Sequence, residues 1–203
     1  VSKLGTSASG AVGIVFSVMA IIQAIGFTFG MGSGSWISRL LGAKEEEKSK
    51  EVAATGFYSA IFLCALMSAI GEWKLNDLMR LLGASETILP YAKDYARYIL
   101  LAAPIMASSF VLNNILRSEG HAKFAMIGIT TGGILNVILD PIFIFGFDMG
   151  MTGAALATVI SQVASVVLCL FHLLHRTDAF RVELRKIRFH WDMLKEIVRY
   201  GLP

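Results

Sequence analysis

Apolar residues dominate five long stretches of the chain, and most charged residues gather in the short segments between them. The uncharged stretches cover residues 4–38, 52–71, 98–116, 124–139 and 150–175. A helix needs about 20 apolar residues to cross the hydrocarbon layer of a membrane. Each stretch suits one crossing if the fourth continues through Asp140 to Phe145, but the first is too long for one straight crossing. Part of it must therefore be a loop, a tilted segment or a bend. The pattern predicts an all-α integral membrane protein, a polytopic bundle of five transmembrane helices.

Basic residues are concentrated in alternate segments between the predicted helices. Segments 39–50, 117–123 and 175–199 carry four, two and seven Lys or Arg residues, whereas the longer 72–97 carries four and 146–149 none. The positive-inside rule therefore places loops 39–50, 117–123 and 175–196 in the cytoplasm, for a multi-pass protein of the plasma (inner) membrane. The same bias accounts for the net charge of +3. Nucleic acid is not an expected partner, because no basic segment is interleaved with exposed aromatic residues.

The chain is expected to have three parts. Residues 1–174 form the membrane helices, residues 175–196 a linker, and residues 197–203 the start of a further apolar helix. Phe180, Leu184, Ile187, Trp191 and Leu194 recur at helical spacing in and around basic residues, which predicts a basic amphipathic linker at the cytoplasmic membrane surface. An ordinary charged loop is the alternative. The chain begins without methionine and ends as a new helix starts, so we expect it to be part of a longer protein.

One carboxylate stands inside an apolar run, in the stretch NVILDPIFIF. Asp140 is the only charged residue between Lys123 and Asp148. A charge at the centre of a membrane costs about 3 kcal/mol on insertion scales and often marks a path for ions or protons. Asn136 lies one turn earlier on the same face, and Pro141 removes a helical hydrogen bond, which predicts a bend. The oxygen atoms of this turn would suit Na⁺ or a proton. The alternative is that Asp140 only ends the helix near the outer interface.

Other polar residues also fall within the predicted membrane helices. Thr158, Ser161, Gln162 and Ser165 form a stripe along one helical face, which must face protein or a wet cavity, or hold helices together. In the first helix, Gln23 begins a similar stripe that continues through Gly26, Gly30, Ser33 and Gly34, where close helix packing is the favoured interpretation. Pro104 predicts a second bend, and Asn113 and Asn114 on the same helix are candidate cavity residues.

Enzymatic function has no support in the sequence. There is no nucleophile with a neighbouring base, no pair of close carboxylates and no spacing typical of a structural metal site. Cys64 and Cys169 lie in apolar helices, where they are expected to pack. We therefore expect neither catalysis nor a cofactor, and the only predicted ion is Na⁺ or H⁺ at Asp140.

Several motifs together resemble the multidrug and toxic compound extrusion (MATE) transporters. They are GMGSGSWISRLLGAKEEEKSKEVAATG, NNILRSEGHAKFAMIG, GGILNVILDPIFIFGFDMGMTGAALATVISQ and the terminal RYGLP. The resemblance implies a fold of twelve helices in two six-helix lobes, of which this chain is similar to helices two to six of the first lobe. Residues 197–203 would then open helix seven, and the first helix and second lobe would be missing partners.

The resemblance also implies roles for particular residues. Asp140, Asn136 and Thr158 match a cation-coupling site in the first lobe, and Asn113 or Asn114 matches an asparagine implicated in the family. The implied function is an antiporter that exports cationic or amphipathic small molecules across the plasma membrane in exchange for Na⁺ or H⁺. Membrane lipids and drug-like substrates are the implied partners. The part of the fold matched here is expected to be inactive alone.

Two alternatives remain. A lipid-linked oligosaccharide flippase of the same superfamily would favour more basic residues in mid-membrane, and this chain has none there. A non-transporting membrane subunit would use its polar stripes only to hold helices together, and it would tolerate leucine at position 140.

Overall fold

The computed structural model describes residues 6–176 and 191–201, and this part of the chain is helical throughout with short connections. Five helices are long and apolar enough to cross a membrane. They are α1 (Thr6–Gly42), α2 (Glu46–Trp73), α4 (Leu89–Ser118), α5 (Ala122–Pro141), which continues as the π-helix η2 (Ile142–Gly146), and α6 (Gly150–Arg176). Two shorter helices are α3 (Leu75–Leu81) and α8 (Trp191–Gly201). The prediction of an all-α bundle with five transmembrane helices is confirmed.

The first helix is longer than one straight crossing requires, as the sequence predicted, but it contains no loop. It is a single helix of 37 residues, which corresponds to about 55 Å at about 1.5 Å per residue. The hydrocarbon layer is only about 30 Å thick. Helix α1 must therefore tilt, extend beyond the hydrocarbon, or both, and Arg39 in its last turn suits an end that extends beyond the hydrocarbon.

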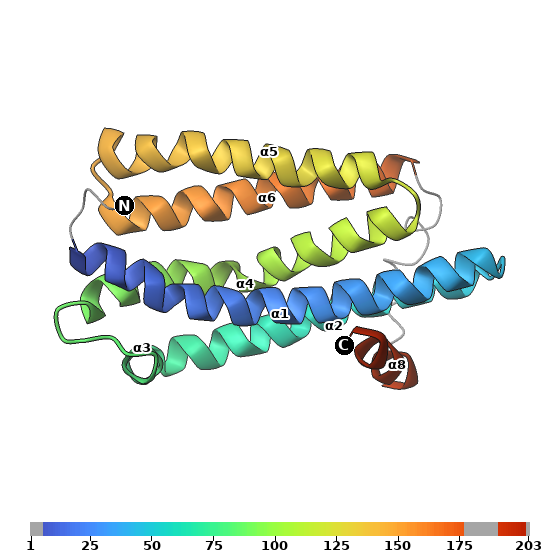
Figure 1. Cartoon of the computed structure of the whole chain (residues 1–203), viewed down its shortest axis with the longest axis horizontal. Coiled ribbons are helices and arrows are strands. Elements are labelled where there is room, and N and C mark those ends of the chain that lie inside the picture. The colour runs from blue at the N-terminus through green and yellow to red at the C-terminus, as the bar shows by residue number, and fades with distance from the viewer. Residues whose placement is uncertain (1–5, 177–190, 202–203) are drawn as a thin grey trace.

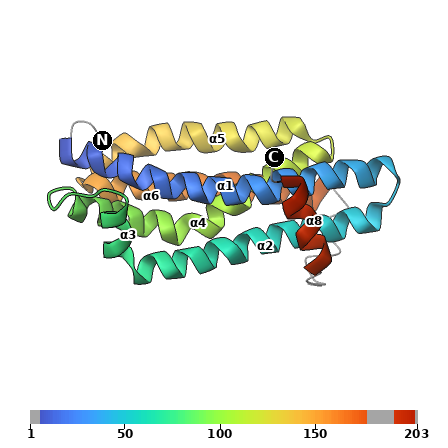
Figure 2. The ribbon, with the colours of Figure 1, turned by 60° about the horizontal axis from the view of Figure 1, so that its bottom comes forward.

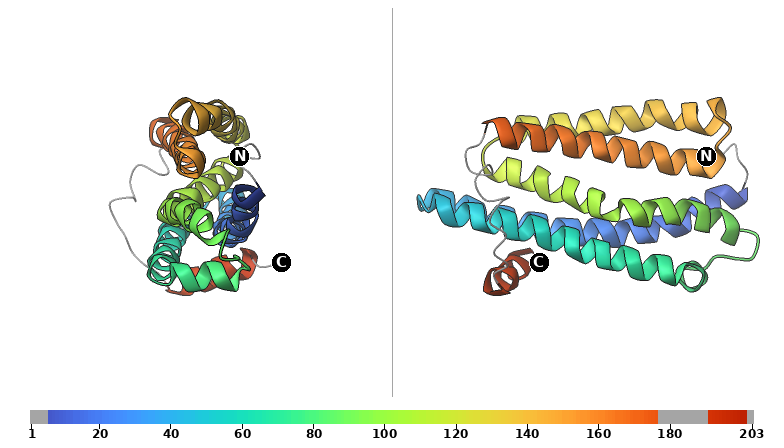
Figure 3. Two further views of the ribbon diagram at one scale, coloured as in Figure 1. Left: turned by 90° about the vertical axis from the view of Figure 1, so that its left-hand side faces the viewer. Right: turned by 180° about the vertical axis from the view of Figure 1, so that it is seen from behind.

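The long helices form two groups that share α4 as their common element. Helices α1, α2 and α4 pack together, and α5 and α6 form a pair on the other side of α4 (Figures 1 and 3). Helix α4 packs against all four other long helices. Its central position explains its many fully buried small residues, among them Ala96, Ala103 and Ala107, because small side chains let neighbouring helices approach closely.

Helix α4 also changes direction near its middle (Figures 1 and 3). Pro104 lies inside the helix at about this position and has no N–H to donate to the preceding turn. The Ser108 hydroxyl donates to the Pro104 carbonyl at 2.7 Å, one turn later. The missing N–H at Pro104 offers a physical reason for this change of direction, which carries the second half of α4 towards α6.

Helix α8 crosses α1 and α2 on the side away from α5 and α6 (Figure 2). Backbone meets backbone at this crossing. A Cβ atom on Gly32 would collide with the Ile197 carbonyl, and one on Gly201 would collide with the Thr28 carbonyl. The Tyr200 ring lies 6.1 Å from that of Trp36, and the Arg39 guanidinium lies 4.8 Å above the Tyr200 ring. Helix α8 is thus docked on α1 by its Ile197–Gly201 edge.

Most of the predicted amphipathic linker, 177–190, lies outside the described residues. Helix α8 begins at Trp191 and continues to Gly201. It therefore runs through the boundary at residues 196 and 197 that the sequence suggested between the linker and the next helix. The two predicted parts share one helix at this point.

The turn between α4 and α5 carries a partly buried carboxylate. Gly120 closes the turn with φ at 84°, a left-handed conformation that glycine adopts without strain. The neighbouring Glu119 has a buried oxygen, Oε2, with no hydrogen-bond partner among the described residues. Burial raises the pKa of the Glu119 carboxyl to about 7, since a low-dielectric environment disfavours the charged form.

Stability is therefore expected to depend on pH through Glu119. The folded protein holds this proton more tightly than the unfolded chain, so the stabilisation is complete below the ordinary carboxyl pKa of about 4.3. It is lost as the pH rises through about 7. Thermal unfolding of the full-length protein at pH 5.5 and pH 8 measures the effect. In Glu119→Gln, the difference in unfolding temperature between pH 5.5 and pH 8 should be smaller than in the unsubstituted protein. In Glu46→Gln, at an exposed acid of α2, that difference should be unchanged. Equal losses in both variants would contradict the assignment.

Candidate functional site

The last two turns of α5 carry Asn136 and Asp140, directly before the helix changes type. The α-helix ends at Pro141, and the wider π-helix η2 follows it, with the Phe147 N–H donating to the Ile142 carbonyl at 3.0 Å. Pro141 has no N–H for the Val137 carbonyl, which agrees with the predicted change in the helix. The α-helix thus ends directly after the acid, and a single π-turn follows before the chain reverses into α6.

The start of α6 packs closely against η2 and holds this corner together. A Cβ atom on Gly153 would lie 2.8 Å from the Phe143 carbonyl oxygen, so only glycine allows the two backbones to approach this far. This close approach fixes the position of α6 along the axis of α5. It places Thr158, slightly more than one turn beyond Gly153, opposite Asn136.

Asn136 and Thr158 form a direct contact between α5 and α6. The Asn136 Nδ2 donates to the Thr158 Oγ1 at 3.4 Å, and the Thr158 hydroxyl donates to the Ala154 carbonyl at 3.1 Å. Both side chains are partly buried. With the hydroxyl proton directed at Ala154, the Thr158 oxygen presents lone pairs, and the Asn136 amide presents its carbonyl oxygen as an acceptor.

Asp140 is directed into the protein. Its Oδ1 atom is buried and has no hydrogen-bond partner among the described residues. The Tyr95 side chain of α4 is only 6% exposed and interacts with both Thr158 and Asp140. A buried carboxylate oxygen without a donor is unfavourable unless a proton or a cation accompanies it.

The arrangement is an oxygen-rich niche with one charge. Asp140 supplies a carboxylate, Asn136 an amide oxygen, and Thr158 and Tyr95 hydroxyl oxygens. Hard cations prefer such oxygen ligands, and one carboxylate balances one positive charge. Within residues 6–176 and 191–201, no group of three or more His, Cys, Asp or Glu side chains could hold a metal ion. A single carboxylate among neutral oxygen donors has the charge to balance a proton or one monovalent cation.

Tyr95 was missed by the sequence analysis. It lies in the segment 72–97, which the charge pattern places between two predicted membrane helices. In the structure α4 already begins at Leu89. The signal that could have found it is Pro90, which lies in the first turn of α4, a position that proline favours. A helix starting there buries Tyr95 against α6.

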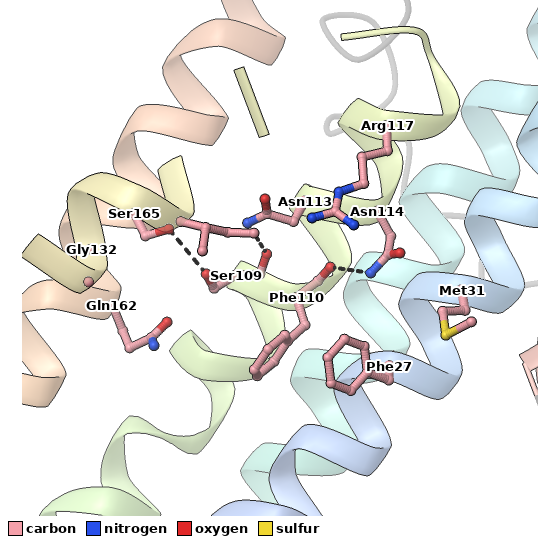
Figure 4. A pocket seen from close by; sticks show the side chains of 12 residues that line it. Phe27, Met31, Ser109, Phe110, Asn113, Asn114, Arg117, Gly132, Gln162 and Ser165 are labelled. Atoms are coloured by element: carbon pink, nitrogen blue, oxygen red, sulfur yellow. Dashed lines mark hydrogen bonds between the residues drawn. The ribbon is translucent and has the colours of Figure 1, made fainter. Parts of the chain in front are cut away.

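The predicted cavity residues lie farther along the helices and only partly belong together. Asn113, Asn114 and Gln162 line a hollow of about 500 Å³ between α1, α4, α5 and α6 (Figure 4). Ser161 and Gln23 do not line it. The Ser161 hydroxyl donates to the Ala157 carbonyl at 2.7 Å and is buried, so in this structure it sits in the packed interface between helices.

One hydrogen bond between α4 and α6 and one within α4 lie along one wall of this hollow. The Ser109 hydroxyl donates to Ser165 Oγ at 3.4 Å, and the Asn113 Nδ2 donates to the Ser109 carbonyl at 3.0 Å (Figure 4). The Asn113 Oδ1 is buried without a partner among the described residues. Gly132 reaches the same wall, because its Cβ position lies 3.2 Å from the Ser161 carbonyl oxygen, whereas Gly133 has open space beside it.

The glycine stripe of the first helix is a packing surface, as the sequence favoured. Gly26 and Gly30 lie against Phe110 and Asn114, and Gly34 lies against the Asn114 backbone. A Cβ on Gly26 or Gly30 would press on α4, whereas one on Gly34 would make an ordinary contact, so Gly26 and Gly30 let α1 and α4 approach closely. The stripe thus holds the helix that carries the cavity residues Asn113 and Asn114.

Several known proteins are similar to this chain. A family model described as MatE matches residues 1–142. The multidrug export protein MepA of Staphylococcus aureus (strain MRSA252) is 35% identical over 193 residues, which are 95% of this chain and 43% of that protein. The protein of the same name from Staphylococcus saprophyticus is 34% identical over the same length. The chain therefore spans less than half the length of these curated relatives.

Solved structures extend the similarity to the arrangement of the helices. A crystal structure of MATE in the bent conformation matches with a TM-score of 0.93 at 35% identity, covering 100% of this chain and 46% of that chain. An inward-facing conformation of a multidrug resistance MATE family transporter of the MOP superfamily matches with the same TM-score, identity and coverage. By family model, sequence identity and helix arrangement together, the chain belongs to the multidrug and toxic compound extrusion (MATE) family.

Proposed function

We propose that the full-length protein is an ion-coupled multidrug efflux antiporter, which exports cationic or amphipathic small molecules across the plasma membrane in exchange for Na⁺ or H⁺. The observation that carries the proposal is the buried, unpartnered oxygen of Asp140, beside Asn136, Thr158 and Tyr95 in a bundle of five transmembrane helices. The relatives named multidrug export proteins support the substrate class.

The coupling follows from the position of the acid in the helix. Binding of a proton or Na⁺ at Asp140 neutralises a charge one residue before the proline that ends the α-helix. We infer that η2 can pack against the start of α6 in more than one arrangement. The loss of this charge would favour one of them and so change the shape of the space between the helices. An ion can shift this equilibrium only by its difference in affinity for the two arrangements.

Transport requires more of the fold than the part matched here. The chain spans 43% of the length of the MepA relative, and we infer that the family's first helix and second lobe complete the path for substrate. Loops 39–50, 117–123 and 175–196 face the cytoplasm in this proposal, and membrane lipids surround the exposed apolar faces of α1, α2, α5 and α6.

Reconstituted full-length protein tests the proposal. Proteoliposomes loaded with ethidium are given an opposing gradient of either Na⁺ or pH, and ethidium movement is followed by fluorescence. One of the two gradients is expected to accelerate movement, and an ionophore that collapses that gradient should remove the acceleration. Movement that is independent of both gradients, or no movement of ethidium or any other cationic dye, would show that the proposal is wrong.

A further inference from the structure

Polar side chains form a row along one face of α6, from the niche around Asp140 to the turn between α4 and α5. They recur every three or four residues, a spacing that places them on the same helical face. The row is about 21 Å long at about 1.5 Å per residue, which is most of the hydrocarbon thickness of about 30 Å. After its first member, the side chains are at most 8% exposed. The members of the row are Thr158, Ser161, Ser165, Cys169 and His172.

The row begins beside Asp140. Thr158 contacts Asn136 of α5 at 3.4 Å, and the Tyr95 hydroxyl is hydrogen-bonded to Thr158 and interacts with Asp140. The Thr158 and Ser161 hydroxyls each donate to a carbonyl of the preceding turn, so each oxygen atom can still accept a hydrogen bond. A proton that leaves the Asp140 carboxyl therefore has hydroxyl acceptors within the same niche.

Residues of α4 and α5 enclose the middle of the row. The Ser109 hydroxyl of α4 donates to Ser165 Oγ at 3.4 Å, and Ser165 is hydrogen-bonded to the Cys169 thiol. The Asn113 Nδ2 lies 3.8 Å from the Cys169 Sγ. On the α5 side, a Cβ atom on Gly128 would lie 2.5 Å from the same sulfur, so no side chain separates the two helices there. The Asn113 Oδ1, in a side chain only 5% exposed, has no donor among the described residues. Such an acceptor is unfavourable, and a water molecule held in the row would satisfy it.

The row ends at a cluster of titratable side chains. His172 is stacked on Phe124 with ring centroids 3.5 Å apart, and the His121 ring lies 5.1 Å from the His172 ring. Glu119 is two residues before His121 in the turn between α4 and α5, and burial raises the pKa of its carboxyl to about 7. Imidazoles and such a carboxyl exchange protons readily near neutral pH. Besides Glu119 and Cys169, the charged or titratable residues within four positions of the two histidines are Arg117, Lys123, His175 and Arg176.

We propose that this row conducts protons between Asp140 and the turn between α4 and α5, so that the coupling ion is H⁺ and His172 and Glu119 form the cytoplasmic end of its route. The route presupposes the ion-coupled antiport proposed for the full-length protein. The proton leaves the Asp140 carboxyl for the first hydroxyl, and each hydroxyl or bridging water accepts one proton and passes on its own. His172 and then Glu119 receive the proton and release it to the cytoplasm. Gaps of about one helical turn, about 5.4 Å, are within reach of one bridging water molecule.

Proton and dye movements in proteoliposomes test the route. Liposomes that hold the full-length protein, with the pH-sensitive dye pyranine inside, are given a pH gradient, and ethidium movement and internal pH are recorded together. Ser165→Ala and His172→Phe should each slow proton-driven ethidium movement at least about tenfold, because a positioned proton carrier contributes about 100- to 10,000-fold to a proton transfer. Exchange of radiolabelled for unlabelled ethidium at equal pH needs dye binding and conformational change but no net proton movement. This exchange should be unchanged in both variants.

Two matched variants remove the same chemical groups outside the row. Ser108→Ala removes a buried hydroxyl that donates to the Pro104 carbonyl within α4, and His175→Phe removes an exposed imidazole of α6. Both variants should keep the proton-driven rate.

Three outcomes would overturn the proton route. The first is ethidium movement that follows a Na⁺ gradient and ignores a pH gradient, which removes the route but leaves the ion-coupled antiport intact. The second is a proton-driven rate that survives both Ser165→Ala and His172→Phe. The third is an equal loss of proton-driven movement and of exchange at equal pH in these two variants, which would mean that the row only holds helices together. Ethidium that does not move under any gradient would remove the antiport and the route together.

Discussion

In the Asp140→Asn variant of the full-length protein, ethidium efflux is expected to lose its dependence on the ion gradient while the protein still folds. Asparagine has nearly the same size as aspartate, but its amide does not take up a proton near neutral pH, and it supplies no negative charge to Na⁺. A coupling free energy of about 1–3 kcal/mol corresponds to a change in affinity of about 5- to 150-fold. We expect the gradient-driven rate to fall by a factor in this range, measured in the same proteoliposomes as the unsubstituted protein.

The matched control is Asp148→Asn. Asp148 is exposed in the turn after η2 and has a left-handed φ of 53°, a conformation that asparagine also tolerates well. This variant should keep its gradient-driven efflux. Thermal unfolding of both variants verifies that they are folded. Undiminished coupling in Asp140→Asn would exclude a coupling role for the acid, and the same loss in Asp148→Asn would point to a general effect of removing an acid near the connection between η2 and α6.

The second large effect is expected for Gly32→Ala, which should loosen α8 from α1. The new Cβ would occupy the place of the Ile197 carbonyl, so the two backbones must separate. Overpacking of a tight contact costs about 1–3 kcal/mol, enough to raise the fraction of detached α8 by about 5- to 150-fold. Trypsin cleavage after Lys195 or Arg199, followed by mass spectrometry of the full-length protein in nanodiscs, measures this fraction.

Gly42→Ala is the control on the same helix, because nothing lies within 4 Å of the Cβ position at Gly42. Alanine favours helix over glycine by about 1 kcal/mol, so this variant should be at least as stable as the unsubstituted protein. A second variant, Gly201→Ala, places the clash on the other side of the crossing, against the Thr28 carbonyl, and should resemble Gly32→Ala. Cleavage rates that are equal in all three variants would contradict the docking of α8.

The membrane helices could be predicted because their signal is local. An uncharged stretch of about 20 residues is sufficient to identify a crossing, and the five stretches correspond to the five long helices. Pro104 and Pro141 act on their own helices through a missing N–H, so both changes of helix geometry were also predictable. The contact between Asn136 and Thr158 could be anticipated only with the resemblance to a family.

Features that depend on packing between distant segments were not predicted. Tyr95 reaches Asp140 only because α4 begins within a charged segment and then packs against α6. The docking of α8 depends on Gly32 and Gly201, which are 169 residues apart in the sequence and give no local signal.

The contacts of α1 near Thr28–Gly34 have a mechanical consequence. On one face Gly30 and Gly34 rest on the backbone of α4, and on another Gly32 rests on the backbone of α8. Flexible side chains usually absorb small displacements between helices. At the α8 face Gly32 meets only backbone atoms, whereas at the α4 face the Asn114 side chain is the nearest neighbour of Gly30. We therefore expect a sliding or rotation of α1 to move α8 with it, because the backbones of the two helices are in direct contact at Gly32 and Gly201.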